Sequence, residues 1–262
     1  MARIAEWRRQ LARFLLGWLP ILALLAVWEG VARLGFFSPF LLPSFSSAAA
    51  RLLADLVSGD LLINLALTLE RALAGFALAG AAGVALGVMI ARVPAVRWFF
   101  DPLVSIGLPM PKIAFLPIFI LWFGVFDESK IIMIAFNAVF PVIVAAAAAT
   151  ENIDRVMLWS ARSLGANPRQ LLYQIAVPAA LPEIFTGLQV AMPISLIVAV
   201  ICEMTMGGEG LGGALMTQMR FADSQGVFSG IIAIAIAGAA LVKAMDMIRR
   251  RLLVWHQETQ DP

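Results

Sequence analysis

The interval between two long apolar runs of this chain reads TENIDRVMLWSARSLGANPRQLLYQIAVPAALP, from Thr150 to Pro182. Its first part predicts a short helix, because the Asp154 carboxylate can accept hydrogen bonds from the N–H groups of a first helical turn. Gly165 marks the end of that helix, since glycine readily adopts the left-handed backbone of a helix C-terminus. We therefore expect a short amphipathic helix that stops at an elbow.

The second part of the interval predicts another helix. Asn167 is a good N-cap, Pro168 suits the first helical position, and Gln170 stands where a capping box has its second member. Pro178 is expected to end this helix. A polar knob of two helices in an apolar chain has two interpretations, an interfacial helix that rests on lipid headgroups or a plug that docks into a partner protein.

Composition places the chain in the membrane. Hydrophobic residues make up 61% and charged residues 14% of its 262 residues, and the mean hydropathy is +0.91. These values lie far outside the range of soluble domains. The net charge of +2 gives no support for nucleic-acid binding. One cysteine, Cys202, and one histidine, His256, exclude a disulfide framework and a Cys/His metal site, which leaves only carboxylate sites open.

Apolar runs of spanning length occur six times and predict an all-α polytopic membrane protein with six transmembrane helices. The first run could imitate a secretory signal peptide, but its length and the presence of Trp28 and Glu29 favour a retained span. Residues 1–13 and 249–262 are then terminal tails around a transmembrane domain of residues 14–248. The expected spans are residues 14–34, 61–91, 102–126, 131–149, 183–206 and 227–248.

Arginine residues give the six spans an orientation. If the spans alternate, twelve arginines fall on one side, including Arg92, Arg162 and Arg251, whereas the opposite loops are richer in acidic residues. The positive-inside rule makes the arginine-rich side cytoplasmic. Both termini and the 150–182 interval are then expected inside, and residues 35–60 form an external loop that contains a short helix near Arg51.

Small residues form a stripe in the second expected span. They recur at intervals of four, which would allow another helix to approach closely in lipid. The stripe fits packing within the chain and a subunit interface equally well. Its members are Gly75, Ala79, Gly83, Gly87 and Ala91.

Residues 108–124, LPMPKIAFLPIFILWFG, bring three prolines and a lysine into the third expected span. Because each proline removes a backbone hydrogen bond, we expect a broken helix that lines a protein-walled or water-filled pathway. Lys112 would lie near mid-depth, about ten residues into the span. Two interpretations remain open. In the first, Lys112 has a structural role, either in an ion pair with Glu203 or another carboxylate or in a first turn that lies outside the membrane. In the second, Lys112 faces the pathway, where its charge lowers the cost of desolvating a small anion. The candidate pathway residues are Pro109, Pro111, Lys112, Phe115, Pro117 and Glu203.

A glycine motif after the fifth expected span does not indicate nucleotide binding. Gly208, Gly210 and Gly213 have the spacing Gly-x-Gly-x-x-Gly, but no strand precedes them and no Gly-Lys-Ser/Thr follows. We interpret the motif as a flexible external turn and expect no ATP site in this chain.

The interval that contains Ala161-x-x-x-Gly165 and Pro178-x-x-x-Pro182 resembles the EAA loop of permease subunits from bacterial ATP-binding-cassette (ABC) importers. The resemblance implies a coupling helix that is gripped by an ATPase subunit. Trp159 departs from the pattern, because the family often has glutamate there. The residues implied in coupling are Trp159, Ser160, Ala161, Arg162, Ser163, Leu164, Gly165, Ala166 and Arg169.

The proline-rich segment, together with Ser129-Lys130 and Phe140-Pro141, resembles the nitrate, sulfonate, taurine and bicarbonate branch of these permeases. This implies a type I importer permease in the bacterial inner membrane, with two copies of the chain, two cytoplasmic ATPase subunits and an external solute-binding protein. It also implies a non-catalytic subunit without a cofactor of its own, whose partners bind ATP and Mg, and which carries a small anion such as a sulfonate, taurine, nitrate or bicarbonate.

Other functions remain possible at this point. A small heteroaromatic or vitamin-precursor solute is an alternative within the same family. A self-sufficient secondary transporter would need intramembrane ionisable residues that carry a coupling ion, and few candidates exist. A membrane-embedded enzyme would need a catalytic constellation, which the sequence does not suggest.

Overall fold

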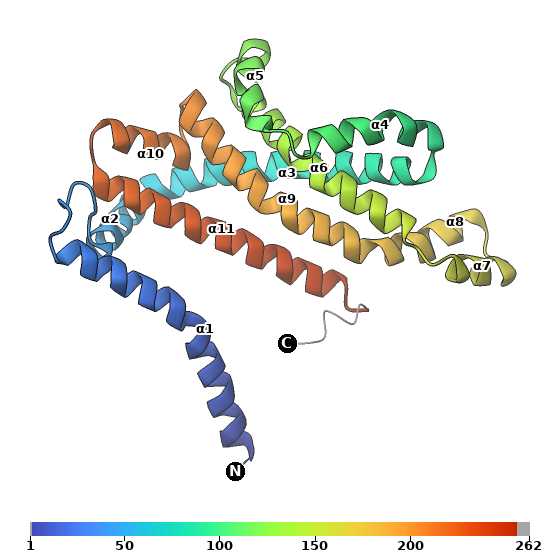
Figure 1. The fold of residues 1–262 in the computed structure, drawn as a ribbon, viewed down its shortest axis with the longest axis horizontal. Coiled ribbons are helices and arrows are strands. Elements are labelled where there is room, and N and C mark those ends of the chain that lie inside the picture. Colours follow the sequence, from blue (N-terminus) through green and yellow to red (C-terminus); the bar gives the residue numbers. More distant parts are fainter. Residues whose placement is uncertain (1, 256–262) are drawn as a thin grey trace. The chain divides into compact units, whose positions relative to one another are not determined.

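The computed structural model describes residues 2–255, with side chains from Gly17 onward except that of Leu172, and most of this part is helical. It divides into two compact units, residues 1–62 with 214–233 and residues 63–213 with 234–262. Figure 1 labels most of the helices. They are α1 (Ala2–Arg33), α2 (Phe45–Ser58), α3 (Asp60–Arg92), α4 (Pro94–Gly107), η1 (Lys112–Phe115), α5 (Leu116–Phe123), α6 (Asp127–Glu151), α7 (Arg155–Ser163), α8 (Pro168–Gln170), η2 (Leu171–Ala176), α9 (Val177–Met206), α10 (Leu211–Arg220) and α11 (Ser224–Leu252).

The first unit is held by polar contacts at the end of α1. The Trp28 indole N–H donates to the Pro43 carbonyl at 3.0 Å, and the Glu29 carboxylate accepts from the backbone N–H and the hydroxyl of Ser46. The following helix, α2, is the short helix expected near Arg51, and it is capped by Ser44. These contacts fix the turn between α1 and α2.

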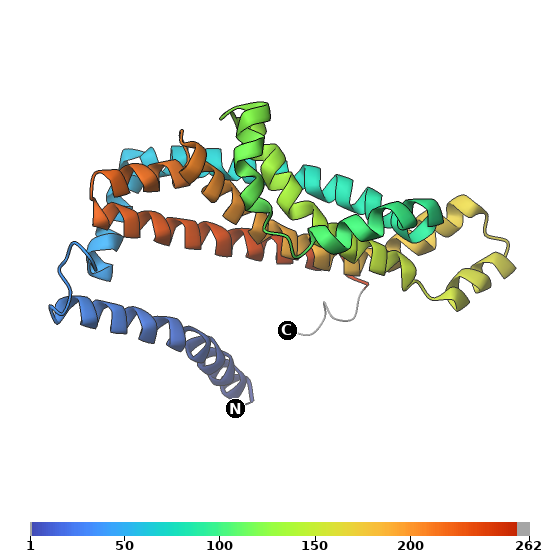
Figure 2. The same ribbon diagram turned by 45° about the horizontal axis from the view of Figure 1, so that its top comes forward.

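The core of the second unit lies around α6, which packs along α9 (Figures 1 and 2). The side chains at its centre are fully buried: Met133, Ile134, Ala138, Val142 and Ala146 have no exposed surface. On α9, Gly187 allows the helix to approach α6 so closely that a Cβ atom would lie 2.4 Å from the Ala145 side chain. Small residues therefore set the distance between these helices.

The small-residue stripe of α3 packs within the chain. A Cβ atom at Gly75 would lie 2.4 Å from Ile134, and one at Gly83 would lie 2.7 Å from Val142. Both of these partners belong to α6. The structure therefore favours packing within the chain over a subunit interface for this stripe.

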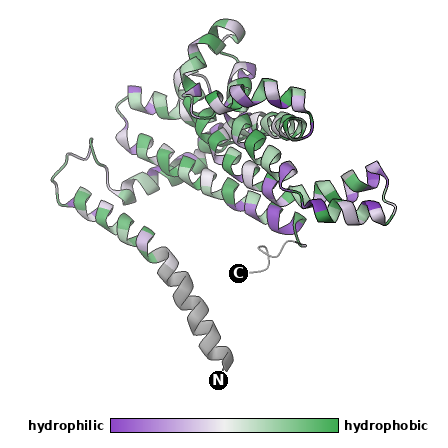
Figure 3. Cartoon of the chain, turned by 45° about the vertical axis from the view of Figure 1, so that its right-hand side comes forward, coloured by the Kyte–Doolittle hydropathy of each residue, from purple (hydrophilic) through white to green (hydrophobic). Residues whose placement is uncertain are grey.

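Four helices of the described chain are long and apolar enough to cross a membrane, and a fifth span exists if α4 and the η1–α5 segment are counted together. Those four are α3, α6, the continuous run Pro168–Met206 and α11. Apolar residues dominate these long helices in Figure 3. The first expected span, 14–34, falls within α1 and the turn after it. Only part of its side chains is described, and α1 is not among the four.

The third expected span, 102–126, forms as a broken helix that begins earlier than expected. Its first part belongs to α4, which already begins at Pro94, and its second part bends away from α4 by 98°. The break lies at residues 108–111, where two prolines interrupt the helical hydrogen bonds. The expected break is therefore confirmed, and the bounds of the span are corrected.

Candidate coupling segment and translocation path

The first helix of the coupling segment forms as its sequence predicts. The Asp154 side chain accepts the Val156 N–H at 2.8 Å and so caps α7. At the other end the Gly165 N–H donates to Arg162 O at 2.9 Å, and the Ala166 N–H reaches back to Ala161 O at 3.0 Å. Gly165 has φ +86°, and nothing lies within 4 Å of a Cβ placed there. Glycine is thus required at position 165 by the left-handed backbone and not by a close neighbour.

The second helix begins with the expected capping box. The Asn167 side chain accepts the Gln170 N–H, the Gln170 side chain accepts the Asn167 N–H, both at 2.9 Å, and Pro168 occupies the first turn. Pro178, however, does not end the helix. The wide turn η2 precedes it and α9 continues through it. Since Pro178 lies where α9 starts, its missing N–H costs little, and the expected stop is wrong.

The coupling segment presents large apolar side chains to the outside. On α7, Leu158 turns inward, against the buried cluster around Ala149 and Ile184. Leu164 is 89% exposed and Trp159 is 60% exposed. The polar residues of α7 are exposed as well. In α7 and the elbow, half-buried side chains occur only at Leu158, Ala161 and Ala166. An exposed apolar group on an otherwise polar knob suits a partner surface.

The break between α4 and α5 places Lys112 beside the middle of α6. Its ammonium group donates to Leu108 O at 3.1 Å and lies 4.7 Å from the centre of the Phe140 ring. Phe140 stands 13 residues after Asp127 and 11 before Glu151, so it is roughly 20 Å and 17 Å from the two ends of α6. Lys112 therefore lies beside the middle of α6, and its expected depth in the membrane stays a prediction.

Aromatic rings surround the same break. Phe136 lies 6.0 Å from Phe115, 5.6 Å from Phe119 and 5.9 Å from Phe140, measured between ring centres. Pro109, Pro111 and Pro117 are exposed, and Phe115 is half-buried. The pathway candidates other than Glu203 therefore lie together in one proline-broken, aromatic segment.

Glu203 does not belong to that segment. It has no exposed surface, and its carboxylate accepts hydrogen bonds from Arg71 at 2.7 Å, from the Thr68 hydroxyl at 2.8 Å and from the Gly212 N–H at 3.0 Å. Arg71 also pairs with Asp127 at 2.9 Å. The ion-pair partner of Glu203 is thus Arg71 and not Lys112. Glu203 is among the candidates from the sequence, but nothing in the sequence signals its pairing with Arg71.

The glycine turn after α9 encloses the Glu203 carboxylate. Gly210 has φ +121°, and a Cβ atom there would lie 2.4 Å from the carboxylate. A Cβ atom at Gly212 would lie 2.3 Å from Val200 O. The expected flexible turn is therefore a packed cover, and its glycines are required by close approach to the charged side chain.

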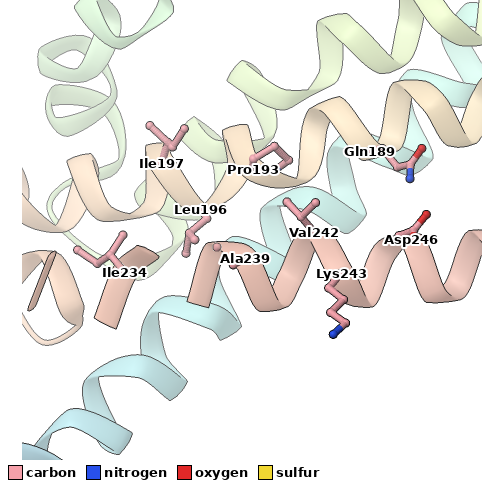
Figure 4. A pocket seen from close by; sticks show the side chains of 10 residues that line it. Gln189, Pro193, Leu196, Ile197, Ile234, Ala239, Val242, Lys243 and Asp246 are labelled. Atoms are coloured by element: carbon pink, nitrogen blue, oxygen red, sulfur yellow. The ribbon is translucent and has the colours of Figure 1, made fainter. Parts of the chain in front are cut away.

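A cavity of about 670 Å³ lies between α9 and α11 (Figure 4). Its wall is apolar around Pro193 and Val242, and its polar side chains are Gln189, Lys243 and Asp246. In Figure 4 Gln189 and Asp246 lie at the same end of the cavity. None of the expected pathway residues lines this space.

Comparison with known proteins shows the family. Residues 83–254 match the model of the binding-protein-dependent transport system inner membrane component family. The chain is 32% identical to the taurine transport system permease protein TauC of Escherichia coli, with 99% of this chain and 96% of that protein covered. It is 29% identical to a putative aliphatic sulfonates transport permease protein, SsuC, of Bacillus subtilis (95% and 91%) and 31% identical to a formylaminopyrimidine transport permease protein, ThiX, of Halalkalibacterium halodurans (90% and 94%).

Solved structures show the same fold. An inward-facing MetNI methionine ABC transporter chain matches with TM-score 0.58 and 20% identity over 75% of this chain and 95% of that chain. A chain of an amino acid ABC transporter matches with TM-score 0.61 and 15% identity over 76% and 95%. Together with the capped coupling segment and the broken span, these matches show that the chain belongs to the binding-protein-dependent transport system inner membrane components, the permease subunits of ABC importers.

Proposed function

We propose that this chain is the translocating subunit of an importer for a small anion of the sulfonate class. Two copies would form the pathway, two cytoplasmic ATPase subunits would bind ATP and Mg²⁺, and an external binding protein would deliver the solute. ATP-driven closure of the ATPases would move α7 and switch the pathway between outward and inward access. The taurine and sulfonate permeases among the relatives support this substrate class.

The observation that carries the substrate class is the position of Lys112. A cation at the middle of a span is costly unless something stabilises it. The contacts of its ammonium within the described chain are a backbone carbonyl and an aromatic face, neither of which carries a full negative charge. Its positive charge is therefore available to lower the cost of desolvating an anion that passes the break.

Exposed apolar side chains support the coupling role of α7. Trp159 replaces the glutamate that the family often has, and it is largely exposed beside the elbow. With Leu164 it offers the ATPase a hydrophobic contact in place of a charged one. The contact of this subunit with its ATPase would then depend less on salt than one that uses glutamate.

The aromatic rings around the break favour a second candidate, a small heteroaromatic solute. Phe115, Phe136 and Phe140 could stack on a flat ring, and one of the relatives is a formylaminopyrimidine permease. The two candidates differ in how strongly flux should depend on the charge of Lys112.

Replacing Lys112 by methionine tests both candidates. In proteoliposomes with the ATPase and the binding protein, Lys112→Met should lower uptake of a sulfonate about tenfold or more, as expected for the loss of one charge-assisted contact. Lys112→Arg keeps the charge and is the matched control, with uptake near that of the unaltered chain. Uptake of a neutral heteroaromatic solute that Lys112→Met leaves unchanged would favour the second candidate. Full sulfonate uptake by an assembled Lys112→Met complex would contradict the first.

A further inference from the structure

A second polar cavity lies where α3, α4, α6 and α7 meet. Its volume is about 510 Å³, and three arginines, Arg92, Arg97 and Arg155, are among the residues that line it. Thr150 and Asn152 add polar groups from the end of α6. None of these residues belongs to the exposed apolar surface of α7 or to the broken segment around Lys112.

The charges in this cavity do not cancel. One carboxylate, that of Glu151, lines it, and Glu151 is engaged in an ion pair with Arg97. Arg97 is held further by a bond from Nε to Ile90 O at 3.2 Å. The neighbouring Asp154 is not part of the wall, and its Oδ1 accepts the Val156 N–H that caps α7. The residues that line the cavity therefore carry a net positive charge, that of Arg92 and Arg155, which can attract an anionic ligand.

The depth of the cavity identifies what kind of anion it meets. Arg92 is the last residue of α3 and Glu151 is the last residue of α6, and both helices are apolar enough to span a membrane. Their ends lie where the phosphates of lipid headgroups lie. The first turns of α4, which border the cavity, expose Trp98 (82%) and Phe99 (57%), aromatic residues that favour the membrane interface.

We propose that this cavity binds the phosphate of an anionic phospholipid and that the acyl chains lie along the exposed apolar face of α4. Basic pockets between spans at the cytoplasmic surface suit such headgroups. Because Arg155 and Leu158 come from α7, the lipid joins the coupling helix to the ends of α3 and α6. Lipid composition then influences how firmly α7 is held against the spans.

The test counts lipids bound to the full chain. The chain is released from phosphatidylcholine nanodiscs that contain increasing amounts of dioleoylphosphatidylglycerol, and native mass spectrometry follows the bound lipid. We expect saturable, selective binding of phosphatidylglycerol, and at least a tenfold weaker affinity in the Arg92→Gln/Arg155→Gln double variant. Arg250→Gln/Arg251→Gln removes the same charge from the end of α11 and should bind like the unaltered chain. If the double variant does not fold, Arg155→Gln alone should show the same direction of change.

Three outcomes would overturn the proposal. The first is equal binding of phosphatidylcholine and phosphatidylglycerol, or unaltered binding in the double variant. The second is complete displacement of the lipid by excess inorganic phosphate, which would assign the site to a free anion. The third is loss of the lipid when the ATPase is added, which would assign the arginines to that partner. None of these outcomes depends on which solute the complex transports.

Discussion

Glu203 is a fully buried acidic residue whose charge must be compensated inside the protein. Its charge is balanced by Arg71, whose side chain is 7% exposed. Asp127, more than half exposed, pairs with the other side of the same guanidinium. Without Glu203, the buried Arg71 keeps only the half-exposed Asp127 as a carboxylate partner within the described chain, and an incompletely compensated buried charge costs far more than the pair contributes.

Replacing Glu203 by leucine should therefore destabilise the chain by about 3–5 kcal/mol. Thermal unfolding in detergent, followed by helical circular dichroism, measures the loss. Asp246→Asn breaks the exposed pair with Arg250 and serves as the control, with a change of at most about 1 kcal/mol. Equal unfolding temperatures for the two variants would show that the Glu203 pair does not hold the fold.

This pair also shows where sequence reasoning stops. The charges of Arg71 and Glu203 are 132 positions apart, and a single sequence contains nothing that pairs residues at such a distance. Lys112 had therefore been left with Glu203 as a possible partner, although the structure separates them. The helix break beside Lys112, in contrast, followed from the prolines that flank it.

At the scale of elements, the helix caps were predicted correctly from neighbouring residues, whereas features that depend on more distant parts of the chain were not. The caps of α7 and α8 depend on residues two or three positions apart, and they form as expected. The helix continues through Pro178 because the wide turn η2 precedes it, and no local sequence rule predicts that turn. The bend of 98° between α4 and the η1–α5 segment was expected as a break, but the local sequence does not give its angle.

The elbow at Gly165 gives a prediction about coupling. Gly165→Val places a β-branched residue in a left-handed backbone, which costs on the order of 1–3 kcal/mol. We expect α7 to shift, so that ATP hydrolysis continues with little transport or the ATPase no longer copurifies. The measurement is the ratio of solute imported to ATP hydrolysed in proteoliposomes.

Two controls separate this effect from general strain. Gly165→Asn should retain most of the coupling, because asparagine tolerates the left-handed region. Gly59→Val imposes the same strain at φ +88°, also in open space, but far from α7 in the sequence. It should leave the transport ratio unchanged. Normal copurification and transport by Gly165→Val would refute the coupling assignment.

At the scale of the whole molecule, the arginine distribution predicts the orientation in the membrane. Because Cys202 is buried, labelling should report on introduced cysteines, and those at Arg162 and Arg251 should resist an impermeant maleimide added outside intact cells. A cysteine at Glu128, which is exposed next to the first residue of α6, should react. Permeabilised cells, in which all three should react, provide the control. Strong labelling of position 162 from outside would reverse the orientation.

The glycine stripe of α3 has a consequence for the order of events during synthesis. Gly75 meets Ile134, Gly83 meets Val142, and Gly87 meets Ala146, and each pair is 59 positions apart. At a synthesis rate of about 5–20 residues per second, the groove on α3 exists for roughly 3–12 s before the residues that fill it have been made. During that time the α6 side chains that pack against the stripe do not yet exist. Slower translation between residues 87 and 146 would prolong this interval, in which the half-made chain is most open to wrong helix pairing.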